Sequence, residues 1–205
     1  MRSASSAVSG SSPGRPRDPG VDERVVAAAV ELFGDIGWAG FTVEAVARRA
    51  GVGKASIYLR WPTKEALLDA ALAARAVSFS DIDTGTLRGD LLQLVRQLLS
   101  VYLGASGRAM MRLSLDGRLI PGIRQRQEAF YRSQIQAARA VVRRGISRGE
   151  LAEGTSVTLL LDTVCGGAMV HAMSTQDELR ERVAAEAGAY AESLVGFLLG
   201  SSERS

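Results

Sequence analysis

The feature that most constrains the fold of this chain is a close series of helix start and stop signals between residues 41 and 64. Thr42 is a favoured N-cap residue, and Glu44 lies in the turn that follows it. The glycines at 51 and 53 stop that helix, and Pro62 followed by Thr63 ends another helix and begins a third. The spacing predicts short helices over 42–50 and 54–61 joined by a tight turn, the pattern of a helix-turn-helix.

The rest of the chain repeats apolar residues at helical spacing, and no segment shows the alternation of a strand. Hydrophobic residues make up 46% of the sequence and charged residues 23%, which is typical of a folded globular protein and excludes wholesale disorder. We therefore predict an all-α fold of about nine helices, with an N-terminal helix-turn-helix domain and a C-terminal helical domain. The expected helices cover approximately residues 21–37, 42–50, 54–61, 63–78, 87–102, 108–116, 121–148, 155–171 and 175–198.

The helix after the glycine turn has an outer face that suits contact with DNA. A helix that enters the major groove needs small and polar side chains on that face, and Ala55 and Ser56 provide them. Tyr58 can reach a phosphate beside the groove, whereas Ile57 and Trp61 fall on the inward face. The order of these residue types is more specific than any one of them.

Positive charge gathers at the same place. The only two lysines, Lys54 and Lys64, flank this segment, although a solvated basic surface is the alternative interpretation. Lys64 and Thr42 each stand at a helix start, where the helix dipole also favours a phosphate. The net charge of +3 is by itself a weak indication of an anionic partner. In the N-terminal segment, two arginines around Pro16 either form a solubilising tail or enter a minor groove. The candidate DNA contacts are Arg15, Arg17, Thr42, Lys54, Ala55, Ser56, Tyr58, Arg60 and Lys64.

The run FTVEAVARRAGVGKASIY at 41–58, followed by WPTKEALL at 61–68, resembles the signature of the TetR family of transcriptional regulators. Trp61 stands where the family more often has Phe, and Leu59 and Arg60 stand where it more often has an aromatic or histidine pair. These departures affect the identity of the base contacts. The resemblance implies three regions: a disordered basic arm at 1–20, a DNA-binding domain at 21–78 with its helix-turn-helix at about 42–61, and a ligand-binding and dimerisation domain at 79–205.

The resemblance also implies how such a chain works. We expect a homodimer that binds a double-stranded DNA operator with inverted-repeat symmetry, acts as a repressor, and is released by an unknown small-molecule effector. A constitutive or architectural DNA-binding protein without an effector is the alternative. Candidates for the wall of the effector pocket, each of which could instead pack in the core, are Tyr102, Met110, Met111, Phe130, Met169 and Met173.

Two further patterns bear on the C-terminal domain. Ten arginines between Arg108 and Arg148 either form solvated outer faces of helices or line a pocket for an anionic effector. Gly166, Gly167 and Ala168 lie within an otherwise bulky apolar helix, and small residues there indicate close approach of another helix. Because the last two helices are apolar on more than one face, we predict that they bury one side internally and another across a two-fold dimer interface.

The residues that could support other functions are few. Gly51–Lys54 does not form a phosphate loop, because Arg48 stands where that motif requires a glycine. The single cysteine, Cys165, and the single histidine, His171, cannot supply the ligands of a zinc site, and we expect neither a metal nor a cofactor. The favoured interpretation is that Cys165 is a small buried hydrophobic residue and that His171 lies in a pocket or an interface, with a cysteine redox switch as the alternative. An enzyme is a remote possibility, since no nucleophile–base–acid set is evident.

The sequence also suggests where the protein works. A single cysteine fits the reducing cytoplasm. The first twenty residues lack the apolar centre of a secretory signal, and no run of about eighteen apolar residues occurs, so we expect no membrane partner.

Overall fold

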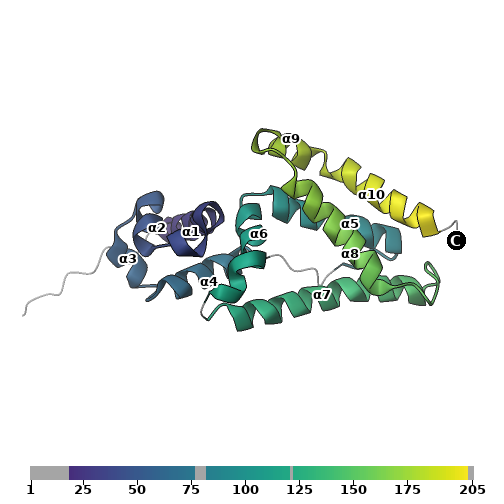
Figure 1. Ribbon diagram of the computed structural model, residues 1–205, viewed down its shortest axis with the longest axis horizontal. Helices are drawn as coiled ribbons and strands as arrows, with labels where there is room; N and C mark the ends of the chain where they lie inside the picture. Colours follow the sequence, from purple (N-terminus) through teal and green to yellow (C-terminus); the bar gives the residue numbers. More distant parts are fainter. Residues whose placement is uncertain (1–18, 77–81, 121, 203–205) are drawn as a thin grey trace, which may run out of the picture.

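The computed structural model describes residues 19–76, 82–120 and 122–202, and these residues form ten α-helices and two short 3-10 helices, with no strand among them. The all-α prediction is therefore confirmed. Figure 1 shows an elongated molecule in which the N-terminal helices gather at one end and the C-terminal helices lie beyond them. The first four helices are α1 (Pro19–Gly40), α2 (Val43–Ala50), α3 (Lys54–Tyr58) and α4 (Lys64–Ala74).

The C-terminal part contains the longer helices. These are α5 (Leu87–Leu103), α6 (Gly107–Asp116), α7 (Arg124–Ser147), α8 (Val157–Met173), α9 (Arg180–Ala185) and α10 (Ala187–Ser202), with 3-10 helices at Gly117–Leu119 and Asp177–Leu179. Helix α6 lies between the two ends of the molecule and packs on α1, while α5 packs against α7, α8 and α10 (Figure 1).

Local signals explain where several helices begin. The side chains of Thr42, Thr63 and Ser156 each accept a hydrogen bond from the backbone N–H three residues later, at 3.1, 3.1 and 3.2 Å. Each satisfies a donor that the first turn of a helix leaves without an intrahelical partner. The predicted starts of α2, α4 and α8 are therefore confirmed at the level of individual hydrogen bonds.

The prediction of one continuous final helix beginning at Thr175 is wrong. The Thr175 hydroxyl donates to the carbonyl of His171 at 2.8 Å, so it belongs to the end of α8 and does not cap a new helix. The chain then passes through the 3-10 helix and the short α9 before α10 begins. Helix α7 also starts three residues later than expected, at Arg124, and Pro121 lies outside the described residues.

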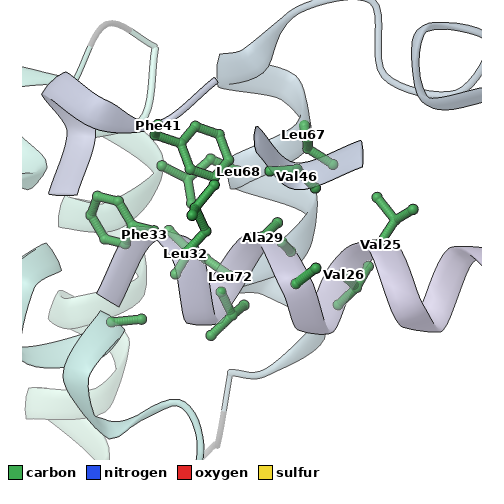
Figure 2. Close-up of a cluster of buried hydrophobic side chains, with 14 of the residues drawn as sticks. Val25, Val26, Ala29, Leu32, Phe33, Phe41, Val46, Leu67, Leu68 and Leu72 are labelled. Atoms are coloured by element: carbon green, nitrogen blue, oxygen red, sulfur yellow. The ribbon is translucent and has the colours of Figure 1, made fainter. Parts of the chain in front are cut away.

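A first hydrophobic core holds the N-terminal helices together (Figure 2). Val25, Ala29 and Phe33 recur on one face of α1 and are fully buried against Leu67 and Leu68 of α4. Each fully buried Val, Leu or Phe side chain stabilises the folded state by about 1.5–3 kcal/mol. This packing fixes α4 against α1 and so provides a rigid base for the two short helices between them.

The first core also includes α6 and the segment after it. Ala109 and Leu113 of α6, with Ile120 and Ile123, are buried in this cluster together with residues of α1 and α4. A Cβ atom added at Gly34 of α1 would lie 3.0 Å from the backbone nitrogen of Ala109, a contact so tight that a larger residue would push the two helices slightly apart. Helix α6 is thus packed against the N-terminal helices, although it lies beyond residue 79 where we placed the domain boundary.

A second core fills the C-terminal part. Its members come from α5, α7, α8 and α10 and include Leu91, Leu94, Val142, Val164 and Val195, all fully or almost fully buried. This core is contiguous along α5, which contacts every other long helix of this part. It places α8 and α10 side by side, with part of each helix still exposed.

Candidate nucleic-acid interface

The turn between α2 and α3 sets the angle at which α3 is presented. Gly51 has φ 67° and ψ 35°, a left-handed conformation that glycine adopts without steric cost. Its N–H donates to the carbonyl of Arg48 at 3.4 Å, and the Val52 N–H donates to that of Ala47 at 3.0 Å. These bonds close the end of α2 and redirect the chain into α3.

Helix α3 has one buried and one exposed face. Ile57 is almost fully buried in the first core, which fixes the rotation of the helix. Lys54 and Ala55 are exposed, and Ser56 is half-buried. Tyr58 is 45% exposed. The small and polar side chains therefore lie on the outer face, as a helix entering a major groove requires.

The cations on this surface already have partners within the chain. Lys54 forms an ion pair with Glu44 of α2, and this hydrogen bond lowers the pKa of the Glu44 carboxyl and raises that of the Lys54 ammonium. Arg60 pairs with Asp22 of α1, and its Nη1 also donates to the Ser56 carbonyl at 3.0 Å. Both pairs tie α3 and its flanks to neighbouring helices.

Lys64 is held at the start of α4. Its Nζ lies 3.8 Å from the centroid of the Trp38 ring, a cation–π contact, and donates to the Phe41 carbonyl at 3.4 Å. Trp38 in turn stacks on Phe41, with ring centroids 5.9 Å apart. Thr42, the cap of α2, is exposed beside this group. The structure thus brings the predicted residues from Thr42 to Lys64 onto α2, α3 and the start of α4, while Arg15 and Arg17 lie outside the described residues.

One residue of this surface was not among the candidate contacts. Leu59, directly after α3, is 86% exposed and lies beside the outer face of that helix. An apolar side chain in the major groove can contact the methyl group of thymine. The only sequence signal for a role of Leu59 was its position, where the family more often has an aromatic residue or histidine.

Two adjoining cavities, both partly open to solvent, lie between α4 and the helices of the C-terminal part. One, of about 290 Å³, lies between α4, α6 and α7, and the other, of about 180 Å³, extends to α5 and α8. Met110 and Phe130 line both cavities, and Tyr102 lines the smaller one. The other predicted wall residues, Met111, Met169 and Met173, line neither cavity. Met173 is 54% exposed on α8.

The arginines between 108 and 148 do not supply the walls of these cavities where the structure describes their side chains. Several of them form ion pairs instead. Arg108 bridges Asp35 of α1, at 3.1 Å, and Asp177, at 3.7 Å. Arg112 donates through Nε to the Gly34 carbonyl at 3.2 Å. These contacts join α6 to the end of α1.

Cys165 and His171 are placed as the packing interpretation expects. Burial raises the pKa of the Cys165 thiol to about 11, so the thiol stays protonated and unreactive near neutral pH. His171 stacks on Tyr190 of α10, with ring centroids 3.8 Å apart and planes within 8°. The Tyr190 hydroxyl donates to the Gly167 carbonyl at 3.1 Å. Both contacts hold α8 against α10.

The small residues of α8 face two directions. A Cβ added at Gly167 would lie 3.3 Å from the Leu194 side chain, so this glycine allows α10 to approach. A Cβ added at Gly166 would meet nothing within 4 Å. Gly166 shares a helical stripe with Leu159 and Val170, which are 67% and 56% exposed. This stripe is an apolar surface on α8 directed away from the second core.

Two further properties hold for the described part of the chain. None of its helices is by itself long and apolar enough to cross a membrane; α8 and the segment Asp177–Ala185 meet those criteria only jointly, across a bend of 108°. Within the same residues, His, Cys, Asp and Glu side chains do not gather in any group of three or more that could hold a metal ion.

Comparison with known proteins gives one consistent result. Residues 25–71 match the profile described as bacterial regulatory proteins of the tetR family, and residues 81–191 match that of the tetracyclin repressor-like C-terminal domain. The chain is 31% identical over 150 residues to the HTH-type transcriptional regulator AqdR of Rhodococcus erythropolis, covering 73% of this chain and 72% of that protein. It is 29% identical over 173 residues to the uncharacterized HTH-type transcriptional regulator YdeS of Bacillus subtilis, covering 82% and 86%.

Solved structures share the fold. The TetR family transcriptional regulator PfmR from Thermus thermophilus superposes with a TM-score of 0.67 at 20% identity, covering 84% of this chain and 94% of that one. The regulator FadR from Bacillus subtilis, in complex with stearoyl-CoA, superposes with a TM-score of 0.57 at 20% identity, covering 86% and 97%. The arrangement of a helix-turn-helix beside a larger helical domain is common to all three.

Proposed function

This chain belongs to the TetR family of transcriptional regulators, and we propose that it is a homodimeric repressor that binds an inverted-repeat operator and leaves it when a small-molecule effector binds. The observation that carries the proposal is the outer face of α3, where Ala55 and Ser56 stand between Lys54 and Tyr58. We also propose that the protein works in the cytoplasm, is not an enzyme and needs no cofactor.

On DNA, the outer face of α3 enters the major groove and the flanking groups bind phosphates. Ala55 and Ser56 approach base edges, whereas Tyr58 and Lys54 contact the backbone on either side. Lys54 exchanges Glu44 for a phosphate, an exchange that is feasible because the pair is exposed to water. Arg60 is fixed by its ion pair with Asp22, and Lys64 is fixed by its contact with the Trp38 ring. Both side chains therefore orient α3 and the start of α4 as well as adding positive charge. The basic arm with Arg15 and Arg17 reaches the adjacent minor groove.

A second copy of the chain covers the apolar stripe of α8. Leu159 and Val170 are exposed on this stripe, and Phe197 of α10 is also 72% exposed. The open space around Gly166 is what close approach of another helix requires, and no described residue comes within 4 Å of a Cβ placed there. A two-fold axis here would pair α8 and α10 with their copies and place two α3 helices on one side of the dimer.

The two cavities are the proposed effector site, and α6 is the element that connects them to the DNA-binding helices. Met110 and Leu113 of α6 line the larger cavity, while Arg108 and Arg112 of the same helix contact α1. A ligand that moves α6 therefore moves α1 and the helices packed on it. FadR from Bacillus subtilis, which shares this fold, has been solved in complex with stearoyl-CoA, and this supports a small-molecule ligand for this chain. Release from DNA follows if the effector stabilises a spacing of the α3 helices that does not fit the operator.

Footprinting on the DNA that flanks the protein's own gene tests the proposal. The expected footprint is symmetric, with half-sites about one helical turn apart, roughly 34–36 Å, or slightly more. The double variant Tyr58→Ala, Lys64→Ala should lose binding to all sequences, and changes at Ala55 or Ser56 should alter which sequence is preferred. Arg132→Ala on α7 is the matched control, because it removes an exposed charge far from α3.

Two results would count against the proposal. Wild-type affinity in the Tyr58, Lys64 double variant would show that α3 and its flank do not hold the DNA. A footprint without symmetry, from a protein whose DNA binding no ligand alters, would favour the alternative of a constitutive or architectural DNA-binding protein.

A further inference from the structure

The two cavities contain one positively charged side chain among the described residues that line them. Arg75, at the C-terminus of α4, lines the smaller cavity. The two cavities share Met110, Phe130 and Tyr131, so they adjoin at these side chains, and a ligand that displaces them would occupy both. Asp69 of α4 lines only the larger cavity, and the walls of both cavities are otherwise mostly apolar. This combination favours a ligand with an apolar body and a single polar group.

Arg75 is the one charged residue among the described residues that line the smaller cavity, and its guanidinium can only donate hydrogen bonds. The other polar residues of its lining, Tyr102, Tyr131 and Gln134, can each donate a hydrogen bond as well as accept one, and no carboxylate comes from the described residues. Burial raises the pKa of the Tyr102 phenol, which keeps its proton at neutral pH. Donors and one guanidinium suit a carboxylate, which only accepts hydrogen bonds and binds arginine in bidentate geometry. The described lining of the smaller cavity offers no opposite charge to a cationic group, and Asp69 lines only the larger cavity, so the carboxylate is expected at the Arg75 end.

Arg75 also connects the cavity to the DNA-binding helices. Its Nη2 forms an ion pair with Glu23 in the first turns of α1, and the two side chains are 37% and 68% exposed. An ion pair with this much solvent contact is readily exchanged. A ligand carboxylate within the cavity therefore competes directly with Glu23 for the same guanidinium.

We infer that the effector is an apolar monocarboxylate, and that its carboxylate replaces Glu23 as the partner of Arg75. The inference rests on the proposed function, because it names the class of ligand for the proposed effector site. It also identifies a local event that accompanies binding: the link between the end of α4 and the start of α1 opens when the carboxylate binds.

The test compares ligands that differ only in charge. Straight-chain carboxylates from hexanoate to dodecanoate are titrated into the full-length protein by calorimetry, beside the corresponding primary alcohols. One charge-assisted contact should make the best carboxylate bind about tenfold more tightly than its alcohol. Arg75→Met should abolish that preference, and Glu23→Gln should strengthen carboxylate binding because it removes the competitor. Arg88→Met is the matched control, since Arg88 forms a similar exposed pair with Glu192 away from the cavities.

The results separate this inference from the proposed function. Equal binding of alcohol and carboxylate, or an unchanged preference in Arg75→Met, would overturn the inference. So would the failure of every carboxylate in the series to bind while the protein still gives a symmetric footprint on DNA. Loss of the footprint in the wild-type protein would instead refute the proposed function. Circular dichroism of each variant confirms that the helices remain folded.

Discussion

Replacement of Asp90 should measurably destabilise the C-terminal part of the protein. Asp90 is the one fully buried charged side chain among the described residues. Its carboxylate accepts hydrogen bonds from the backbone N–H and the hydroxyl of Thr84, at 2.6 and 2.8 Å, and from Nη2 of Arg148 at 3.3 Å. Arg144 lies 3.8 Å away. Asp90 therefore joins α5 to the C-terminal end of α7 and to the segment that precedes α5.

The size of the effect follows from these contacts. A hydrogen bond to a charged group contributes about 1.5–3 kcal/mol, and two such bonds to Thr84 would be lost in Asp90→Ala. The two arginines keep access to water and are less affected, since their side chains are 33% and 28% exposed. We expect a loss of about 3 kcal/mol in the free energy of unfolding, and a fall in Tm of roughly 6–12 °C.

The pH dependence provides a second check. Burial raises the pKa of Asp90, but the hydrogen bonds from Thr84 and Arg148 and the charge of Arg144 outweigh it, so the pKa lies below its ordinary value of 3.8. A carboxyl with a lowered pKa stabilises the folded state fully above the unfolded pKa, and this contribution is lost as pH falls through the folded value. The stability difference between wild type and Asp90→Asn should therefore be largest near neutral pH and shrink below about pH 4.

Thermal unfolding followed by circular dichroism at pH 7 and at pH 3–4 measures both effects. Glu178→Gln serves as the control, because this exposed carboxylate lies outside the network. If Asp90→Ala unfolded within about 0.5 kcal/mol of wild type at pH 7, the reasoning from buried hydrogen bonds would be refuted. A difference that grew as the pH fell would refute the assigned direction of the pKa shift.

Three other changes have definite expected outcomes. Glu44→Gln should tighten DNA binding and steepen its salt dependence, because the change frees Lys54 and removes a negative charge beside a phosphate. Fluorescence anisotropy measures the affinity, with Glu31→Gln as the control. An affinity equal to that of wild type would contradict the prediction. The double variant Leu159→Glu, Val170→Glu places two charges on the apolar stripe of α8, so it should sediment as a folded monomer in analytical ultracentrifugation. A persistent dimer would place the interface elsewhere. The native Cys165 thiol should react with a disulfide reagent at pH 8 roughly a hundredfold more slowly than in urea, because its raised pKa limits the thiolate; equal rates would contradict this assignment.

The N-terminal helices could be predicted closely because their signals are local. Thr42, Thr63 and the glycine at 51 act on backbone groups within a few residues, so their effect is legible without knowledge of the fold. The break after α8 was missed because local signals alone do not determine it. Thr175 has capping-box spacing, but its hydroxyl bonds backwards to His171, and that choice depends on how α8 ends against α10.

The cavity was less predictable for a different reason. Methionines on α8 were chosen by residue type, but packing of α8 on α5 and α10 turns Met173 outward and leaves Met169 away from both cavities. Arg75 was not a candidate, because its position beside α5 and α7 depends on contacts between distant segments. The partners of Lys54 and Arg60 on α2 and α1 likewise follow only from the tertiary arrangement.

The central claim is that α3 and its flanking residues hold the protein on DNA. Its most direct test is the affinity for the footprinted DNA, measured by anisotropy over a series of salt concentrations with wild type, Lys54→Ala and Arg132→Ala. The account predicts that log K falls linearly with log salt, and that Lys54→Ala lowers the slope by about 0.9 for each protomer, or about 2 for the dimer, while Arg132→Ala leaves it unchanged. An unaltered slope and affinity in Lys54→Ala would contradict the claim.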